Sequence, residues 1–404
     1  MSTSTLHAED WPNWRGPRYD GSSAETKFAR SWTGERPQRW ERNLGSAYSG
    51  LTVVGDRLFT CGVAMETSER GKPEPMQVLY CLRTADGEVA WKSVIEDIFR
   101  NEWGDGARGT PTYDDGRVYI MGANGTVACF DANDGKKLWA RKYDERPMWG
   151  YSGSVLIRGT LAIVATGGKK GALRALDKSS GREVWRCGDD ASAGYSTPYP
   201  FTFEKKEYVI SFLGTSAIAA EVTSGREVLR IPWKTDWNVN AATPIYHDGH
   251  LWLGSGYRTG CAVYALKPAG DKLEAKEVWK SKVMLNKFQT PVLFGGKLYA
   301  FDERAFKCVD FMTGELDWKE RGQNGTVVLA DGNLITLTES GKLRIGPASP
   351  TKFEPTGEAQ ILDDRCWTVP TLVDGRLYAR NLERVVCIDL SESQPVDSGS
   401  PKSH

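Results

Sequence analysis

Short apolar stretches alternate with turns rich in Gly and Asp along most of this chain. Pairs such as Asp115-Gly116 and Gly295-Gly296 separate apolar runs, and these residues tolerate the positive φ angles of tight hairpins. No segment keeps an apolar period of 3.6 residues over the length of a helix. The pattern therefore predicts an all-β chain that is built from hairpins.

One phrase repeats within this pattern. It runs from a small residue and an apolar residue through an acidic turn with Gly to an apolar residue and Trp, as in 129–139 and 175–185. It returns about every 47 residues, a period typical of propellers and solenoids. We expect the tryptophans at its end to pack between neighbouring repeats as structural docking residues. They are Trp40, Trp91, Trp139, Trp185, Trp279 and Trp318.

Each repeat contains two hairpins, and therefore four antiparallel strands. Counting the tryptophan position, with Leu229 and Phe353 as substitutes, indicates eight blades. Trp40 has no hairpins before it, whereas the last blade, within 367–390, lacks an outer strand of its own. The prediction is an eight-bladed β-propeller with four antiparallel strands per blade, in which an N-terminal strand around Trp40 closes the ring.

The ends of the chain differ from the repeats. We predict a disordered N-terminus at 1–10, a single propeller domain at 11–390 and a disordered tail at 391–404, because both ends are polar. The aromatic and proline-rich start of 11–30 predicts a segment that docks on the ring.

Charge and composition exclude several partners. Lys plus Arg and Asp plus Glu both number 52, without a basic stripe, which argues against nucleic acid and anionic membranes. No apolar run has transmembrane length, and a monomer is expected. The start lacks the apolar core of a signal peptide, although Leu6-His7-Ala8 resembles the end of a cleavage site. The protein is periplasmic or secreted if a native leader was removed, and otherwise cytoplasmic.

The eight cysteines do not suggest bridges. Cys81, Cys129, Cys308 and Cys387 share one repeat position in different blades, which should lie too far apart for a disulfide. The other four have no partner at a hairpin spacing. All eight are predicted to be unpaired.

A ligand site is expected where the longer connections meet, at one mouth of the central channel. Aromatic, amide and charged residues begin the inner strands there, which suits a planar or sugar-like ligand. The alternative is that they cap the channel and bond to water. The candidate residues are Trp103, Asp105, Arg108, Trp149, Tyr151, Tyr195, Trp237, Asn238, Asn240, Lys287, Gln289, Arg365 and Trp367.

Other chemistry is sparse. Only four histidines occur, and His247 and His250 lie in a tight hairpin where other repeats carry ordinary turn residues. No nucleophile–base pair stands out, so neither a catalytic residue nor a metal site is predicted.

The repeated phrase resembles the tryptophan-docking repeat of pyrroloquinoline-quinone-type eight-bladed propellers, over nearly the whole chain. One branch of this family, the quinoprotein alcohol dehydrogenases, uses adjacent cysteines, calcium and an Asp base. This chain has no adjacent cysteine pair and no Cys-x-x-Cys-His haem site. The other branch, which is similar to the outer-membrane assembly propeller lipoprotein, is non-catalytic and binds protein partners. The lipobox cysteine of that branch is also missing.

The sequence favours a non-catalytic binding or scaffold propeller, without a cofactor, that presents its channel mouth to a protein or small-molecule ligand. The alternative is a divergent quinone-dependent oxidoreductase that oxidises an alcohol or sugar. Under that alternative, pyrroloquinoline quinone and calcium would be the cofactors. One of the four mouth tryptophans would stack on the quinone, Arg108 or Arg365 would pair its carboxylates, and Asp105 or Asp236 would act as the base.

Overall fold

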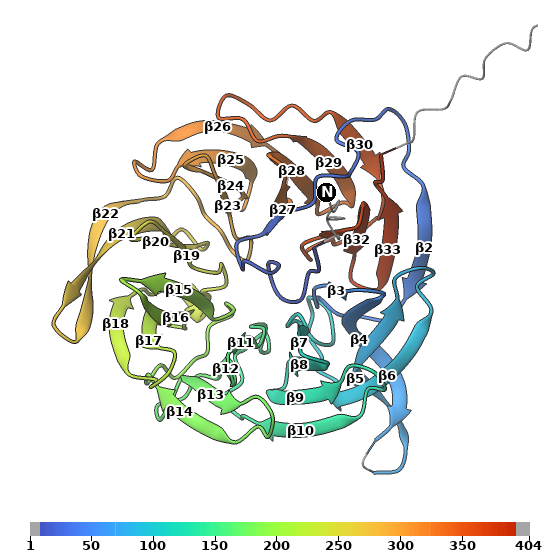
Figure 1. The fold of residues 1–404 in the computed structure, drawn as a ribbon, viewed down its shortest axis with the longest axis horizontal. Helices are drawn as coiled ribbons and strands as arrows, with labels where there is room; N and C mark the ends of the chain where they lie inside the picture. Colours follow the sequence, from blue (N-terminus) through green and yellow to red (C-terminus); the bar gives the residue numbers. More distant parts are fainter. Residues whose placement is uncertain (1–8, 69, 323, 393–404) are drawn as a thin grey trace, which may run out of the picture.

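The computed structural model describes residues 9–68, 70–322 and 324–392, and the strands of these residues form eight sheets around a central axis (Figure 1). The four strands of each blade are called A to D, in the order in which they are named below. Strand A lies nearest the axis and strand D lies outermost. The predicted eight-bladed propeller is confirmed. The predicted disordered ends, 1–10 and 391–404, lie outside the described residues except for 9, 10, 391 and 392.

Blades 1 to 4 each take four consecutive strands. They are β3 (Thr52–Val54), β4 (Arg57–Thr67), β5 (Pro73–Arg83) and β6 (Val89–Asp97); β7 (Thr112–Asp114), β8 (Arg117–Met121), β9 (Thr126–Asp131) and β10 (Lys137–Lys142); β11 (Leu156–Arg158), β12 (Leu161–Ala165), β13 (Leu173–Asp177) and β14 (Glu183–Cys187); and β15 (Tyr199–Phe203), β16 (Lys206–Phe212), β17 (Ser216–Glu221) and β18 (Glu227–Pro232).

Blades 5 to 7 continue this order, and blade 8 combines both ends of the ring. They are β19 (Ile245–His247), β20 (His250–Ser255), β21 (Gly260–Ala269) and β22 (Lys272–Ser281); β23 (Val292–Phe294), β24 (Lys297–Phe301), β25 (Ala305–Asp310) and β26 (Leu316–Arg321); β27 (Gly325–Ala330), β28 (Asn333–Thr338), β29 (Lys342–Pro347) and β30 (Gly357–Gln360); and β31 (Thr371–Val373), β32 (Arg376–Arg380), β33 (Arg384–Asp389) and β2 (Gln38–Asn43). The short β1 (Ser22–Ser23) adds to β27 in parallel, and a 3₁₀ turn, η1, spans Asp236–Asn238.

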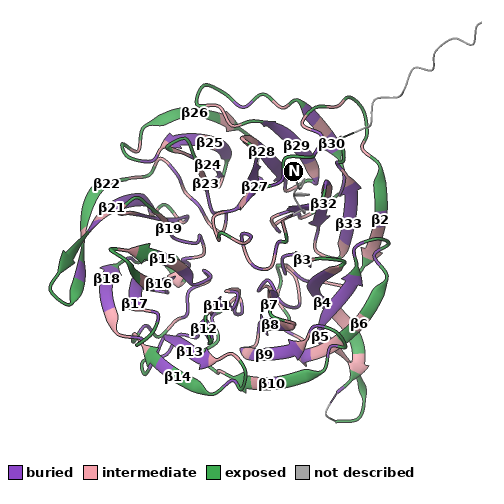
Figure 2. Ribbon diagram, in the orientation of Figure 1, coloured by how far each residue is buried: buried purple, intermediate pink, exposed green. Residues whose placement is uncertain are grey.

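Burial follows the position of a strand within its blade (Figure 2). The middle strands β8 and β9 are buried at almost every residue, because neighbouring blades cover both of their faces. The outer strand β10 keeps only Trp139 buried. The sequence of an outer strand therefore needs one large apolar anchor, while the middle strands need continuous apolar runs.

Each of the six repeated tryptophans joins its blade to the next. Each indole Nε1 donates to a backbone carbonyl in the C–D connection of the following blade, over 2.8–3.0 Å. Trp91 of blade 1, for example, donates to Ala132 O of blade 2. The contact satisfies the polar edge of the ring while its apolar body is removed from water. These residues therefore occupy structural positions between blades.

The docked indole lies against the glycine of the repeated phrase in the following blade. Gly87 has a φ of +72°, and a β-carbon there would lie 2.6 Å from the Trp40 ring. The glycines that face the tryptophans of blades 1, 2, 3 and 5 would bring a β-carbon equally close, within 2.5–2.7 Å. Glycine is required at these positions both by the left-handed backbone and by the docked ring.

The junction between blades 4 and 5 departs from this rule. Leu229 takes the tryptophan position of blade 4, and Gly270 in the C–D turn of blade 5 has no neighbouring atom within 4 Å of a β-carbon. The indole of Trp233 instead donates to Ser255 Oγ, at the opposite end of the same junction. Between blades 4 and 5, the indole contact therefore lies at the end of the junction where the B–C connection of blade 5 begins, and not at the C–D turn.

The assignment of Phe353 to an outer strand was wrong. Phe353 lies in the connection between β29 and β30, where it is buried edge-on against Phe306 of blade 6. The outer strand β30 presents Gly357 to the indole of Trp32, which donates to Glu358 O at 3.1 Å. A tryptophan from outside the repeats therefore covers blade 7, and no periodicity could have assigned it.

The predicted closure of the ring is confirmed. Strand β2 pairs with β33 in antiparallel register, with Trp40 opposite Cys387 and Asn43 opposite Arg384. The Trp40 indole then docks on blade 1 as the other tryptophans do on their neighbours. The outer strand of the last blade thus comes from the beginning of the chain, and it covers the edge of β33 that would otherwise be open.

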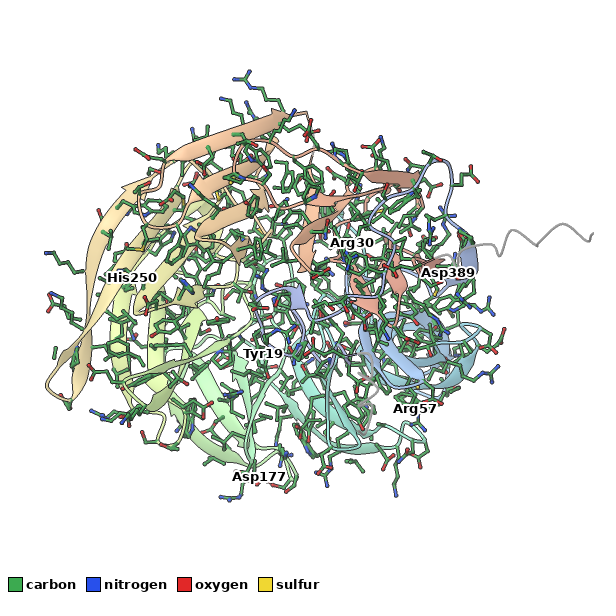
Figure 3. The ribbon with its side chains drawn as sticks, turned by 45° about the horizontal axis from the view of Figure 1, so that its top comes forward. Tyr19, Arg30, Arg57, Asp177, His250 and Asp389 are labelled. Carbon is green, nitrogen blue, oxygen red and sulfur yellow. The ribbon has the colours of Figure 1, made fainter. Side chains whose placement is uncertain are left out.

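Residues 9–37, here called the N-terminal segment, cross the channel on the side of the A–B turns (Figure 1). Figure 3 shows Tyr19 of this segment near the middle of the ring. Its backbone bonds to four blades, through Trp11 with Val53, Pro12 with Tyr113, Gly21 with Leu329, and Ala29 with Leu390.

Arg15 fixes the middle of the N-terminal segment. It is 4% exposed, and burial lowers the pKa of its guanidinium to about 10. It donates to four backbone carbonyls, those of Tyr19, Asp20, Thr290 and Pro291. The bonds link a loop of the segment to the start of blade 6, and they supply the partners that a buried cation requires.

All eight cysteines are free, as their positions predicted. Seven are buried, and only Cys187 is half-buried. Burial raises the pKa of Cys61 and of Cys187 to about 12, so thiolate is scarce at neutral pH.

The docked glycine can be tested by two matched substitutions. We expect Gly87→Ala to lower the free energy of unfolding more than Gly270→Ala, by about 1–3 kcal/mol. Both variants incur the left-handed backbone cost, at φ of +72° and +65°, but only the first displaces an indole. Urea unfolding measures the difference. Equal losses in the two variants would show that the indole contact adds nothing.

The thiols can be counted by alkylation and intact mass. Under denaturing, non-reducing conditions we expect eight alkylations, and in the native protein Cys187 should react first because its side chain is the least buried. Replacing Cys187 with Ser should remove the early reaction. A count of six or fewer in the denatured protein would reveal a disulfide.

Candidate functional site

A cavity of about 620 Å³ lies at one mouth of the channel, where all eight D–A connections meet. Its wall includes residues that precede the inner strand of each blade, such as Tyr48 before β3 and Trp367 before β31. Three B–C connections add Tyr257, Glu303 and Glu339. Trp14 of the N-terminal segment also lines the cavity and donates to Thr243 Oγ1 at 3.0 Å. The N-terminal segment crosses the channel on the side of the A–B turns and contributes Trp14 to the cavity, which opens among the D–A connections on the other side.

Aromatic rings dominate the wall, and several pack on one another. Trp367 stacks on Tyr48 with centroids 5.1 Å apart, and it contacts Phe288 at 5.2 Å and Trp103 at 6.3 Å. These four rings are here called the Trp367 cluster. On another part of the wall, Trp149 lies 6.0 Å from Tyr195. Rings held by other rings form a rigid apolar surface before any ligand arrives.

Trp103 stands at the rim with 48% of its surface exposed. Its loop is held by hydrogen bonds, since Asn101 Oδ1 accepts from Trp103 N, and Trp103 O accepts from Tyr48 Oη and from Arg365 Nη1. The position of this exposed indole is therefore set by the backbone around it.

Trp237 is the most exposed tryptophan of the rim, at 66%, and lies within η1. Its φ of +65° is in the left-handed region, which bulky side chains rarely adopt. The turn is closed by hydrogen bonds from Asn238 N to Thr235 O and from Thr235 Oγ1 to Val239 O. Strain of this kind in an exposed aromatic residue favours a binding role over a packing role.

Arg108 places a half-buried positive charge in the wall. Its guanidinium donates to the carbonyls of Gly104 and Gly106 and lies over the rings of Phe99, at 4.5 Å, and Tyr48, at 5.8 Å. Burial lowers its pKa to about 10. Among the described residues it forms no salt bridge, because nearby Asp105 pairs with Arg100, so an anionic group of a ligand could pair with this guanidinium.

The two carboxylates of the wall are engaged. Glu339 accepts from the indole of Trp367 and from Asn324 Nδ2, and Asn324 accepts in turn from Gln289 Nε2. Glu303 accepts from the backbone N–H of Tyr257. Both carboxylates therefore position wall residues.

Eight of the thirteen candidate residues line the cavity. They are Trp103, Arg108, Trp149, Tyr195, Trp237, Lys287, Gln289 and Trp367. Asn238 adjoins the wall within η1, and Arg365 backs it by contacting Trp103 and Trp367. Asp105, Tyr151 and Asn240 bond instead to backbone groups of the loops and strands around them.

Sequence reasoning did not assign Trp14, Tyr257, Phe288, Glu303 or Glu339 to the site. The B–C residues Tyr257, Glu303 and Glu339 share no repeated motif, so nothing in the sequence marks them. Trp14 belongs to the aromatic segment that was predicted to dock, and Phe288 lies between two candidates. An aromatic residue beside a predicted site residue was a usable signal.

Eight four-stranded blades clasped by docked tryptophans, with a loop-lined pocket at one mouth, define a propeller of the pyrroloquinoline-quinone-like repeat class. Within it, the chain belongs to the bacterial family whose model is described as outer membrane protein assembly factor BamB. That model matches residues 29–269 and 158–345 in overlapping stretches.

Individual relatives are distant. The outer membrane protein assembly factor BamB of Yersinia pestis is 24% identical over 279 residues, which cover 67% of this chain and 65% of that protein. The crystal structure of BamB from Moraxella catarrhalis has a TM-score of 0.63 at 16% identity, covering 88% of this chain and 99% of the other. Quinohemoprotein alcohol dehydrogenase from Comamonas testosteroni also scores 0.63, at 12% identity, covering 97% and 82%. The structural likenesses concern the fold alone.

In the described part of the chain, no group of three or more His, Cys, Asp or Glu side chains could hold a metal ion. No helix among the same residues is long and apolar enough to cross a membrane.

The strain at Trp237 predicts an unusual order of stability. We expect Trp237→Gly to be more stable than Trp237→Ala by about 1 kcal/mol, because both lose the same exposed ring but only alanine keeps the left-handed strain. Met148, 62% exposed and outside the left-handed region, is the control site. At position 148, the alanine variant should have a free energy of unfolding about 0.4–1 kcal/mol higher than that of the glycine variant. The same order at both sites in urea unfolding would remove the argument for strain.

Proposed function

We propose that this protein is a non-catalytic scaffold of the BamB type, which assists outer membrane protein assembly by binding other proteins with its mouth face. The observation that carries the proposal is the family match, which spans 29–345 and so includes most of the ring. The function itself comes from the description of that family and from the names of the relatives.

The exposed side chains of the mouth face support protein binding. Trp103, Met148 and Trp237 are large apolar residues that are 48%, 62% and 66% exposed, and all three lie in D–A connections. Tryptophan is enriched among the residues that dominate interface energies. Because the loops of Trp103 and Trp237 are fixed by hydrogen bonds, little conformational entropy remains to be lost on binding.

The chemistry of the wall supports a role without catalysis. Neither histidine nor cysteine occurs among the described residues of the wall, and both of its carboxylates accept hydrogen bonds from neighbouring groups. No side chain there has the pairing of nucleophile and base that acyl or phosphoryl transfer needs.

One observation favours the second candidate, a quinone-dependent dehydrogenase. Five tryptophans and Arg108 converge on a cavity of ligand size, as stacking on a planar acid would require. The fit is incomplete, however. Asp105 and Asp236, the carboxylates considered as bases, do not line the cavity, and adjacent cysteines are missing. The residues present suit a planar ligand better than the full quinone and calcium site.

The test combines binding with catalysis. The full chain is mixed with the purified outer membrane protein assembly machinery of its own bacterium, and complex formation is followed by size-exclusion chromatography and calorimetry. We expect a stable complex that Trp237→Glu weakens at least tenfold. Val278→Glu, exposed on the outer strand β22, should have no effect.

The catalytic arm uses the same protein with pyrroloquinoline quinone, calcium, an artificial electron acceptor and a panel of alcohols and sugars. Absence of the complex, together with turnover that Arg108→Met abolishes, would replace the scaffold with the dehydrogenase. A complex that Trp237→Glu leaves intact would move the binding surface away from the mouth.

A further inference from the structure

The cavity wall carries polar hydrogens that lack acceptors. Within the described residues, the indole N–H groups of Trp103, Trp149 and Trp237 find no acceptor, and neither does the hydroxyl of Tyr257. The other two indoles of the wall differ, because Trp14 donates to Thr243 and Trp367 donates to Glu339. The unused donors come from three different D–A connections and one B–C connection, so they surround the cavity.

The charged groups of the wall show the same imbalance. Arg108 and Lys287 are cationic donors, and neither forms a salt bridge within the described chain. Lys287 instead lies over the ring of Tyr257, at 5.4 Å. The carboxylates Glu303 and Glu339 already accept hydrogen bonds. Glu303 accepts on Oε1 alone and Glu339 accepts once on each oxygen, so the wall offers apolar faces and more unused hydrogen-bond donors than carboxylate acceptors.

Such a wall selects a ligand with apolar faces and acceptors but few donors. A prolyl segment has this composition, since each proline presents a flat apolar ring and a carbonyl and carries no N–H. In the polyproline II conformation its carbonyls have no internal partners. Sugars would bring hydroxyl donors that need acceptors, and ordinary extended peptides would bring an N–H at every residue.

The distribution of the donors favours a chain over a compact ligand. Trp149 and Tyr257 belong to the wall of the cavity, whereas Trp103 and Trp237 extend the aromatic surface to the solvent-exposed rim. A compact ligand enclosed by the cavity would leave the exposed faces of the rim unused. An extended segment can place one prolyl ring against the Trp367 cluster and offer carbonyls to the rim indoles.

We propose that the mouth cavity binds a proline-rich segment of a partner protein in the polyproline II conformation. Its rings pack on the Trp367 cluster and its carbonyls accept from the indoles of Trp103, Trp149 and Trp237. Aromatic-lined grooves recognise such segments because the extended conformation is preformed and loses little entropy on binding. The proposal rests on the scaffold function and specifies the chemistry of the partner.

The experiment uses the full chain and a fluorescein-labelled decaproline peptide, with binding followed by fluorescence anisotropy. The matched control peptide has alanine at every second position, which keeps length and charge but restores N–H groups. We expect saturable binding of decaproline and at least tenfold weaker binding of the control peptide. Equal binding of the two peptides would overturn the proposal.

Variants separate the ring from its N–H. Trp237→Phe keeps an aromatic face and should weaken decaproline binding about three- to tenfold, while Trp237→Ala should weaken it more than tenfold. Val278→Ala, exposed on the outer strand β22 away from the mouth, should change nothing. Circular dichroism checks that each variant is folded. Unchanged binding by Trp237→Ala would overturn the proposal.

Failure of this inference is distinguishable from failure of the scaffold function. If the assembly machinery binds and decaproline does not, the proline chemistry is wrong and the scaffold stands. If free pyrroloquinoline quinone displaces bound decaproline and is itself turned over with a substrate, the cavity belongs to the dehydrogenase, and both proposals fall.

Discussion

The contact between an indole and a glycine holds this ring together. No blade can bury its own faces, so each must be fixed at a set distance and angle from its neighbour. The docked tryptophan does so with one hydrogen bond and one flat apolar surface, and only glycine leaves room for it. The central channel and the positions of the loops at its mouth both follow from that repeated geometry.

Most of the fold could be predicted because this contact leaves a mark in the sequence. A tryptophan four residues after a glycine is visible in the sequence at Trp91, Trp139, Trp185 and Trp318. That repeat indicated the blades and their order, and the unaccompanied Trp40 indicated the closure. Blade 7 was misread because Phe353 resembled the missing tryptophan in sequence. In the structure the indole comes from Trp32, which precedes the ring by chain order but covers β30 in space.

The site was only partly predictable for a related reason. The D–A connections could be located as the segments before each inner strand, which is why Trp103, Trp237 and Trp367 were identified. The B–C connections carry no comparable motif, and the contribution of Trp14 depends on where the N-terminal segment crosses the channel. A pocket assembled from all blades and one added segment is a property of the closed ring, which no single repeat encodes.

The junction between blades 4 and 5 gives the ring an uneven resistance to local opening. There the indole clasp joins Trp233 to Ser255 near the mouth, and nothing docks on the turn at Gly270. Amide hydrogens at the tip of the β21–β22 hairpin can therefore exchange with solvent through fraying of that hairpin alone. Amide hydrogens in the C–D turns of blades 2 and 6 can exchange only after Trp91 or Trp279 has separated from the glycine that it contacts. The loop that carries Trp237 lies at the end of the junction that holds Trp233 and Ser255, so fraying of the hairpin at the opposite end would leave that loop in place.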